Sequence, residues 1–144
     1  MDQTEGGAQA RTLGSASVTV LTQDDAALLA AHHVAAFNDA VEAGSFALFL
    51  QLFTDDAVIR FENVPGAGTL EFAGRDAYTR AYAEQPPDDK IDIAGPVTAA
   101  GDAAVVPFTW QRDRAPGTMR LTYAPGSPEA LDEWLVTAMI VHFG

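Results

Sequence analysis

The stretch FNDAVEAGSFALFLQLFTDDAVIRFENVPG, residues 37–66, contains the point at which the hydrophobic pattern of this chain changes from helix to strand. Up to Gly44, apolar residues and one histidine recur at every fourth position: Leu29, His33, Phe37 and Val41. This spacing places them on one face of a helix. From Ala57 onward, apolar and polar residues alternate, which predicts a half-buried strand. The pattern thus predicts a long amphipathic helix that leads into a sheet.

Capping residues set the predicted bounds of the helices. The Thr22 side chain can cap the first helix, with Asp25 in its first turn, and Gly44 ends it. A second, shorter helix is predicted over Phe46–Phe53 and is closed by Thr54-Asp55-Asp56.

The rest of the chain predicts one more helix and several strands. Residues 64–68 break the strand that starts at Ala57, and residues 69–72 return as a short second strand. A third helix is predicted over residues 75–84. Four further strands are expected over residues 90–99, 103–113, 118–124 and 133–143. Short turns between strands imply a largely antiparallel sheet with the helices on one face, which is an α+β fold.

The length and the composition indicate one domain. A chain of 144 residues is the size of a single domain, and 48% hydrophobic residues suffice for a core. Residues 1–21 carry little periodic signal, and we expect them to form a flexible leader. Residues 22–144 then form the domain.

Charge and cysteine content exclude several classes of function. Twenty acidic residues against eight basic ones give a net charge of −12, so we expect neither nucleic acid nor an anionic membrane as a partner. The absence of cysteine excludes a disulfide framework and a thiolate metal site. Neither a signal peptide nor a membrane-spanning run is predicted, and we expect a cytoplasmic protein. No metal-binding motif occurs, and we expect no metal and no cofactor.

Three segments carry a resemblance to a known superfamily. Residues 37–66, FAGRDAY at residues 72–78 and MIVHFG at residues 139–144 resemble, in this order and spacing, segments of the nuclear-transport-factor-2-like superfamily. Its members include ketosteroid isomerase, limonene epoxide hydrolase and SnoaL-like polyketide cyclases. The resemblance implies a cone-shaped fold, in which a curved, mostly antiparallel sheet wraps around a long N-terminal helix, with two further helices. It also implies a deep apolar pocket and a homodimer.

The catalytic groups of ketosteroid isomerase are missing from the matching positions. That enzyme uses a Tyr on the first helix and an Asp on a later strand as an oxyanion hole, with a second Asp as general base. Phe37 stands at the position of the Tyr, and Phe61 stands at the position of the base. No acidic residue occurs from Met119 to Leu121, where the other Asp would lie. A phenyl ring cannot transfer a proton, so the known isomerase mechanism is not expected.

Limonene epoxide hydrolase is matched in part. Its Tyr-x-Asn-x-Pro motif resembles residues 61–65, in which Asn63 and Pro65 match and a Phe replaces the Tyr. At the positions of that enzyme's other acidic and basic groups, this chain has Phe108, Trp110 and Val141. The standard hydrolase mechanism is therefore not expected either.

Strand alternation predicts an apolar pocket. A hairpin turn centred on Ala115-Pro116 would pair Trp110 with Leu121 and Phe108 with Tyr123, and directly opposed residues share a face. The residues expected to contact a ligand are Phe37, Ile59, Phe61, Tyr82, Phe108, Trp110, Leu121, Tyr123, Met139 and Val141.

Four polar residues are candidates for catalysis, and each has an alternative structural role. Asn63 could orient a water molecule or cap the turn before Pro65. His33 could act as an acid or base or simply pack in the core. Glu62 faces outward unless a bulge shifts the strand. Tyr78, one turn before Tyr82, could donate a hydroxyl or pack against the sheet.

These expectations leave two classes of function open. The first is a cofactor-free isomerase, cyclase, dehydratase or epoxide hydrolase that acts on an apolar, secondary-metabolite-like small molecule. The second is a non-catalytic ligand-binding or dimerisation module that has lost the catalytic acids of the superfamily.

Overall fold

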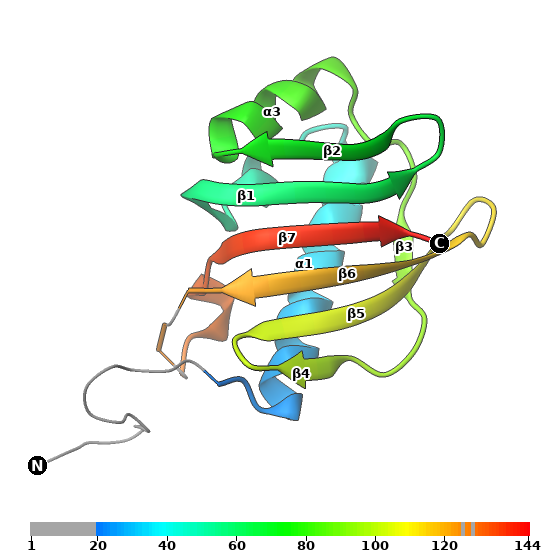
Figure 1. Ribbon diagram of the computed structural model, residues 1–144. Helices are drawn as coiled ribbons and strands as arrows, with labels where there is room; N and C mark the ends of the chain where they lie inside the picture. The colour runs from blue at the N-terminus through cyan, green and yellow to red at the C-terminus, as the bar shows by residue number, and fades with distance from the viewer. Residues whose placement is uncertain (1–19, 125, 128) are drawn as a thin grey trace, which may run out of the picture.

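The long helix expected from the sequence is α1, Gln23–Ala43, and it forms the axis of the molecule (Figure 1). A computed structural model describes residues 20–124, 126–127 and 129–144. The Thr22 side chain accepts a hydrogen bond of 3.0 Å from the Asp25 N–H, which confirms the predicted cap. Gly44 ends the helix with a φ of 70°, a conformation that glycine adopts without strain.

Seven strands form one curved, unclosed sheet that wraps around α1 (Figure 1). The order of the strands is β2-β1-β7-β6-β5-β3, and β4 also pairs with β5. Only the β1–β7 pair is parallel among these described strands, and the others are antiparallel. The strands are β1 Phe53–Val64, β2 Gly68–Ala73, β3 Ile91–Ile93, β4 Thr98–Ala100, β5 Ala103–Trp110, β6 Pro116–Tyr123 and β7 Val136–Phe143. The cone-shaped α+β fold expected from the sequence is confirmed.

The shorter helices lie at one end of the sheet and before its last strand. Helix α2 spans Ala47–Leu50, α3 spans Arg75–Glu84 beside β2, and a 3₁₀ turn, η1, spans Leu131–Glu133 (Figure 1). No helix among the described residues has the length and apolar character that crossing a membrane requires.

The boundary between α2 and β1 differs from the prediction. The predicted helix over residues 46–53 is confined to Ala47–Leu50, and Thr54-Asp55-Asp56 lies within β1 instead of closing a helix. The physical reason is that Phe53 is fully buried and pairs with Val136 of β7, so the strand starts at this anchor.

Three of the later strands are also shorter than predicted, and one of them, expected over residues 103–113, ends at Trp110 as β5. The strand expected over residues 90–99 is divided into β3 and β4, because Gly95-Pro96 interrupts it and proline has no N–H for a ladder. The strand expected over residues 133–143 starts at Val136, after the η1 turn.

The hairpin between β5 and β6 turns earlier than predicted. Arg114 has a φ of 61°, and the Asp113 carboxylate accepts a 3.0 Å hydrogen bond from the Ala115 N–H, which fixes a turn over residues 111–114. Leu121 therefore opposes Ala104 and not Trp110. The shift is an even number of residues, so every side chain stays on its predicted face.

The start of the domain lies slightly before the predicted boundary. Most of the expected leader, residues 1–19, lies outside the described residues. Leu21 is only 4% exposed and packs in the core, and its N–H donates to the Gly101 carbonyl at 2.9 Å. This residue therefore belongs to the domain and not to a leader.

Candidate functional site

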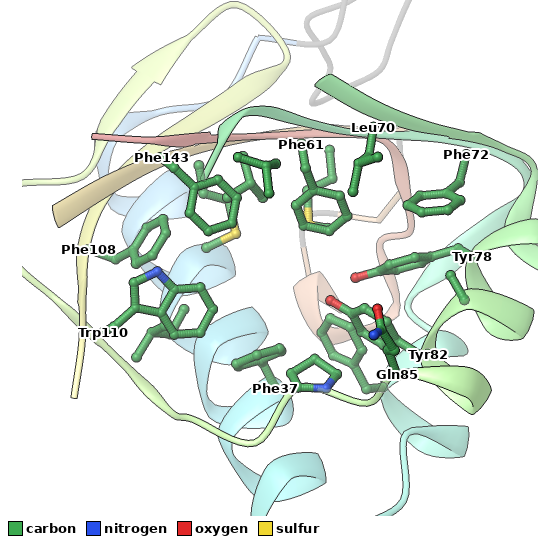
Figure 2. Close-up of a pocket in the computed structure, with 18 of the residues that line it drawn as sticks. Phe37, Phe61, Leu70, Phe72, Tyr78, Tyr82, Gln85, Phe108, Trp110 and Phe143 are labelled. Carbon is green, nitrogen blue, oxygen red and sulfur yellow. The ribbon is translucent and has the colours of Figure 1, made fainter. Parts of the chain in front are cut away.

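A cavity of about 250 Å³ lies between α1, α3 and the concave face of the sheet (Figure 2). Its walls are mostly apolar and aromatic side chains. They are His33, Phe37, Phe49, Phe61, Val64, Leu70, Phe72, Tyr78, Ala81, Tyr82, Gln85, Pro87, Ile91, Phe108, Trp110, Met119, Met139, Val141 and Phe143. No lysine, arginine, aspartate or glutamate is found among these described lining residues.

Aromatic rings from α1, β1, β5 and β7 close around the apolar end of the cavity. Figure 2 shows Phe37 of α1 opposite Phe61 of β1, and Trp110 of β5 beside Phe143 of β7. The Trp110 and Phe143 rings are stacked, with centroids 6.2 Å apart and an interplanar angle of 17°. Rings held in such contacts are restricted in position, which keeps the wall ordered.

A glycine makes room for one of these rings. Gly117 of β6 opposes Phe108 of β5, and a Cβ atom at this glycine would lie 2.5 Å from Cζ of the Phe108 ring. The phenyl ring therefore covers the glycine and is held against the sheet at the edge of the cavity.

Helix α3 supplies the polar end of the cavity. Its first turn is fixed to β1, because the Gly74 N–H donates to the Ala57 carbonyl at 2.8 Å and the Arg75 guanidinium donates to the Phe53 carbonyl at 3.1 Å. This anchoring directs Tyr78 and Tyr82, one turn apart, toward the cavity.

The two tyrosines carry their hydroxyls into the cavity on the same side (Figure 2). Their ring centroids are 4.4 Å apart. Tyr78 is fully buried, and its hydroxyl makes no hydrogen bond of good geometry to any described residue, although the Tyr82 hydroxyl is its near neighbour. Burial, and secondly the neighbouring Tyr82, raises the pKa of Tyr78 well above its usual value, and burial also raises the pKa of Tyr82. Both hydroxyls therefore stay protonated near neutral pH.

His33 lies on the α1 side of the cavity. The side chain is 3% exposed, and the Phe49 and Phe53 rings meet it edge-on at centroid distances of 5.1 and 5.8 Å. Its Nδ1 atom has no hydrogen-bond partner among the described residues. Burial first, and then the neighbouring His32, lowers the pKa of His33 to about 3, so the imidazole is neutral at pH 7.

Most of the residues predicted to contact a ligand line the cavity, and the others lie in the core next to it. The predicted residues that line the cavity are Phe37, Phe61, Tyr82, Phe108, Trp110, Met139 and Val141. Ile59, Leu121 and Tyr123 share the predicted face but lie in the core, outside the cavity lining. Tyr123 donates its hydroxyl to the Leu29 carbonyl at 3.5 Å, so its polar group is used inside the fold.

Two of the four candidate catalytic residues, His33 and Tyr78, line the cavity, and the other two do not. Asn63 is exposed, has a φ of 58°, and donates through Nδ2 to the Phe143 carbonyl at 2.6 Å, a structural role at the end of β1. Glu62 faces outward and contacts Arg60 at 3.0 Å and His142 at 3.5 Å. The β1–β2 register does shift after Phe61, but Glu62 stays paired with His142 of β7 and does not turn inward.

Sequence reasoning missed the wall made by β2 and the end of α3. Leu70, Phe72, Gln85 and Pro87 line the cavity, although none was expected to do so. Leu70 and Phe72 are two residues apart and share one face of β2, so their spacing would have pointed to the cavity once β2 was paired with β1. No three histidine, aspartate or glutamate side chains within the described ranges cluster in a way that could hold a metal ion.

Comparison with known proteins agrees with this fold. The family model of the SnoaL-like domain matches residues 34–137. No curated protein matches the sequence.

Solved structures show the same fold at low sequence identity. A cystatin-like fold protein from Burkholderia xenovorans is 24% identical, with a TM-score of 0.54, over 88% of this chain and 97% of that one. A protein described as a candidate ketosteroid isomerase from Kribbella flavida is 22% identical, with a TM-score of 0.53, over 84% and 78%. A candidate isomerase of the SnoaL-like family from Agrobacterium tumefaciens is 15% identical, with a TM-score of 0.57, over 84% and 98%. At these identities the likeness concerns the fold alone.

Proposed function

The chain belongs to the SnoaL-like domain family, and we propose that it binds an apolar small molecule in the cavity between α1, α3 and the sheet. The observation that carries the proposal is the cavity itself, of about 250 Å³, with aromatic walls and a few polar groups at one end. Ligand sites in proteins are typically concave and apolar, with a small number of polar groups that orient the ligand.

The volume of the cavity limits the size of the ligand. An apolar cavity of ~150 Å³ holds benzene. By proportion, about ten non-hydrogen atoms fit in this one. This size corresponds to a monoterpene or a bicyclic aromatic compound, whereas a four-ring steroid would extend through the mouth.

Binding is better supported than catalysis by the chemistry of the walls. Two neutral hydroxyls, a neutral imidazole and the Gln85 amide are available, and no carboxylate is found among the described lining residues. A general base works best when its pKa is near the working pH, and His33 has a pKa of about 3. A non-catalytic ligand-binding module is therefore the favoured form of the proposal.

Catalysis without a cofactor, by an isomerase, cyclase, dehydratase or epoxide hydrolase, is the second candidate. The observation that favours it is the unpartnered Nδ1 of His33, which lines the same cavity as the Tyr78 and Tyr82 hydroxyls. Turnover of a bound ligand that is lost in His33→Leu, with binding retained, would support this second function.

For either function we propose a cytoplasmic location, from the sequence pattern alone.

Trp110 offers a direct test of binding. It lines the cavity, whereas Trp134 lies elsewhere and donates through Nε1 to the Ser127 carbonyl at 2.9 Å. In a Trp134→Phe variant, titration with naphthalene should change the Trp110 emission and reach saturation. A ligand at 100 times its Kd should also stabilise the fold by about 2.7 kcal/mol, or roughly 5–10 °C in Tm.

The matched control is Trp110→Phe, which keeps Trp134 as the only fluorophore of its kind. Its emission should not respond to naphthalene. A response that never saturates, or one of equal size in both variants, would contradict binding in the cavity.

A further inference from the structure

We propose that Tyr78 and Tyr82 form the recognition end of the cavity and donate two hydrogen bonds to the carbonyl oxygen of a neutral ligand. The inference rests on the proposed function and names its ligand class: a small apolar ketone or aldehyde. Its basis is the combination of a buried, unpartnered donor, a second donor one helical turn away, and a cavity lining that carries no charged side chain among the described residues.

The Tyr78 hydroxyl is the first observation. The residue is fully buried, its hydroxyl lacks a partner among the described residues, and Figure 2 shows the oxygen directed into the cavity. Buried polar groups in proteins nearly always have a hydrogen-bond partner, and each exception calls for an explanation. A ligand acceptor within the cavity would supply the missing partner.

The position of Tyr82 is the second observation. It follows Tyr78 by one turn of α3, the ring centroids are 4.4 Å apart, and both hydroxyls point the same way in Figure 2. A carbonyl oxygen has two lone pairs and can accept from two donors at once. The pair of hydroxyls thus matches one carbonyl oxygen.

The electrostatic environment favours a neutral ligand. A charged group would lose its hydration in this cavity without meeting an opposite charge, because no ionised side chain is found among the described lining residues. The net charge of −12 further disfavours an anion. Burial raises the pKa of both tyrosines, so they remain donors and do not become phenolates near neutral pH.

The test compares two bicyclic compounds that differ in one oxygen. Indane is the hydrocarbon and 1-indanone the corresponding ketone, and both match the volume of the cavity. Their dissociation constants are measured by calorimetry with the full chain. We expect the wild-type protein to bind 1-indanone about tenfold more tightly than indane, which corresponds to about 1.4 kcal/mol. The Tyr78→Phe/Tyr82→Phe double variant should bind both compounds with affinities within about twofold of each other.

Tyr123→Phe is the matched control. It removes another buried tyrosine hydroxyl, but this one contacts the Leu29 carbonyl and lies outside the cavity. The preference for the ketone should therefore persist in this variant. Circular dichroism and the retained affinity for indane show that each variant is folded.

A spectroscopic readout separates recognition from packing. The infrared C=O stretch of bound 1-indanone should lie at lower frequency than that of the free ketone in a hydrocarbon solvent, and the double variant should abolish this shift. A packing effect of the two rings would not move the frequency.

The outcomes distinguish the two levels of the proposal. Equal binding of indane and 1-indanone by the wild type, or a preference that survives in the double variant, would overturn the carbonyl inference and leave the binding function intact. Failure of both compounds to bind would overturn the proposed function itself. Indane-1-carboxylate binding as tightly as the ketone at pH 7.5 would refute the neutral ligand class.

Discussion

His33 has the sequence pattern of a catalytic group, but in the structure it lies in the environment of a core residue. Its place on the apolar face of α1 made it a candidate acid or base. Burial against Phe49 and Phe53 instead lowers its pKa to about 3, so the ring is neutral at pH 7. Such a group can accept or donate one hydrogen bond, but it is a weak base.

The lowered pKa of His33 predicts a loss of stability in mild acid. A histidine that is neutral in the folded state binds its proton only after unfolding when the pH lies between the folded pKa of about 3 and the unfolded value of 6.5. The unfolded state therefore gains protons as the pH falls through 6.5, and the free energy of unfolding decreases. Between pH 7.5 and pH 5 this one group should cost about 2 kcal/mol.

The measurement is urea unfolding at these two pH values in three proteins. His33→Leu should show a pH-dependent loss that is smaller than that of the wild type by about 2 kcal/mol. The control is His32→Gln, an exposed neighbour on the same helix, which should keep the wild-type loss. An unchanged pH dependence in His33→Leu would show that His33 is not held neutral in the fold.

At the scale of elements, two side-chain amides of α1 hold the edge of the sheet to the helix. Asn38 donates to the Ile91 carbonyl and accepts from the Ile91 N–H, each at 2.9 Å. Gln23 makes a similar paired contact at β4, since it donates to the carbonyl of Val97, just before the strand, at 3.0 Å and accepts from the Ala99 N–H within it. Each amide reproduces the hydrogen bonds of a neighbouring strand and satisfies backbone groups of a short strand.

We predict that Asn38→Asp destabilises the protein by about 1–2 kcal/mol. The carboxylate keeps the acceptor for the Ile91 N–H but loses the donor, and it faces the Ile91 carbonyl with a negative charge. Thermal unfolding measures the effect, and hydrogen exchange at Ile91 should report that β3 opens more readily. Asp39→Asn is the control, because this exposed neighbour changes charge without contacting β3. Equal Tm values for wild type and Asn38→Asp would contradict the role assigned to Asn38.

Strand faces could be predicted from the sequence more reliably than strand ends. The β5–β6 turn was misplaced because Pro116 was taken as a turn residue, whereas it opens β6 and an Asx-type contact of Asp113 closes the turn. Because the resulting register error was even, Phe108 and Trp110 still faced the cavity as predicted. Periodicity reports a face directly, but register depends on the few residues of the turn.

How deeply each residue of the predicted face is buried could not be predicted from the sequence. Ile59 and Phe61 alternate on the same face of β1, yet only Phe61 reaches the cavity, because the curvature of the sheet buries Ile59 completely. Likewise, the polar end of the cavity depends on the docking of α3 against β1, which positions Tyr78. These arrangements depend on contacts between segments far apart in the sequence, and local sequence patterns do not predict them.

For the whole molecule, the outer face of the sheet is the surface that the fold leaves without a covering element among those described. Val58 of β1 is 40% exposed and pairs in register with Ala138 of β7, and Ile140 lies two residues further along β7 on the same face. Arg60 and Arg120 flank Ile140 on the neighbouring strands. An apolar centre with a charged rim is typical of a protein interface.

We propose that two copies of this chain associate through that outer face, and we predict a homodimer. Light scattering at micromolar concentration should give twice the mass of the 144-residue chain. Ile140→Lys should dissociate the dimer, since it places a third positive charge beside Arg60 and Arg120, while the cavity on the opposite face keeps its affinity for 1-indanone. Leu48→Lys is the matched control, because Leu48 is 79% exposed on α2 and away from this face, and it should stay dimeric. A monomeric mass for the wild type, or dissociation by both substitutions alike, would contradict an interface at the sheet. Retained binding in a monomeric Ile140→Lys protein would further show that each cavity is complete within one chain.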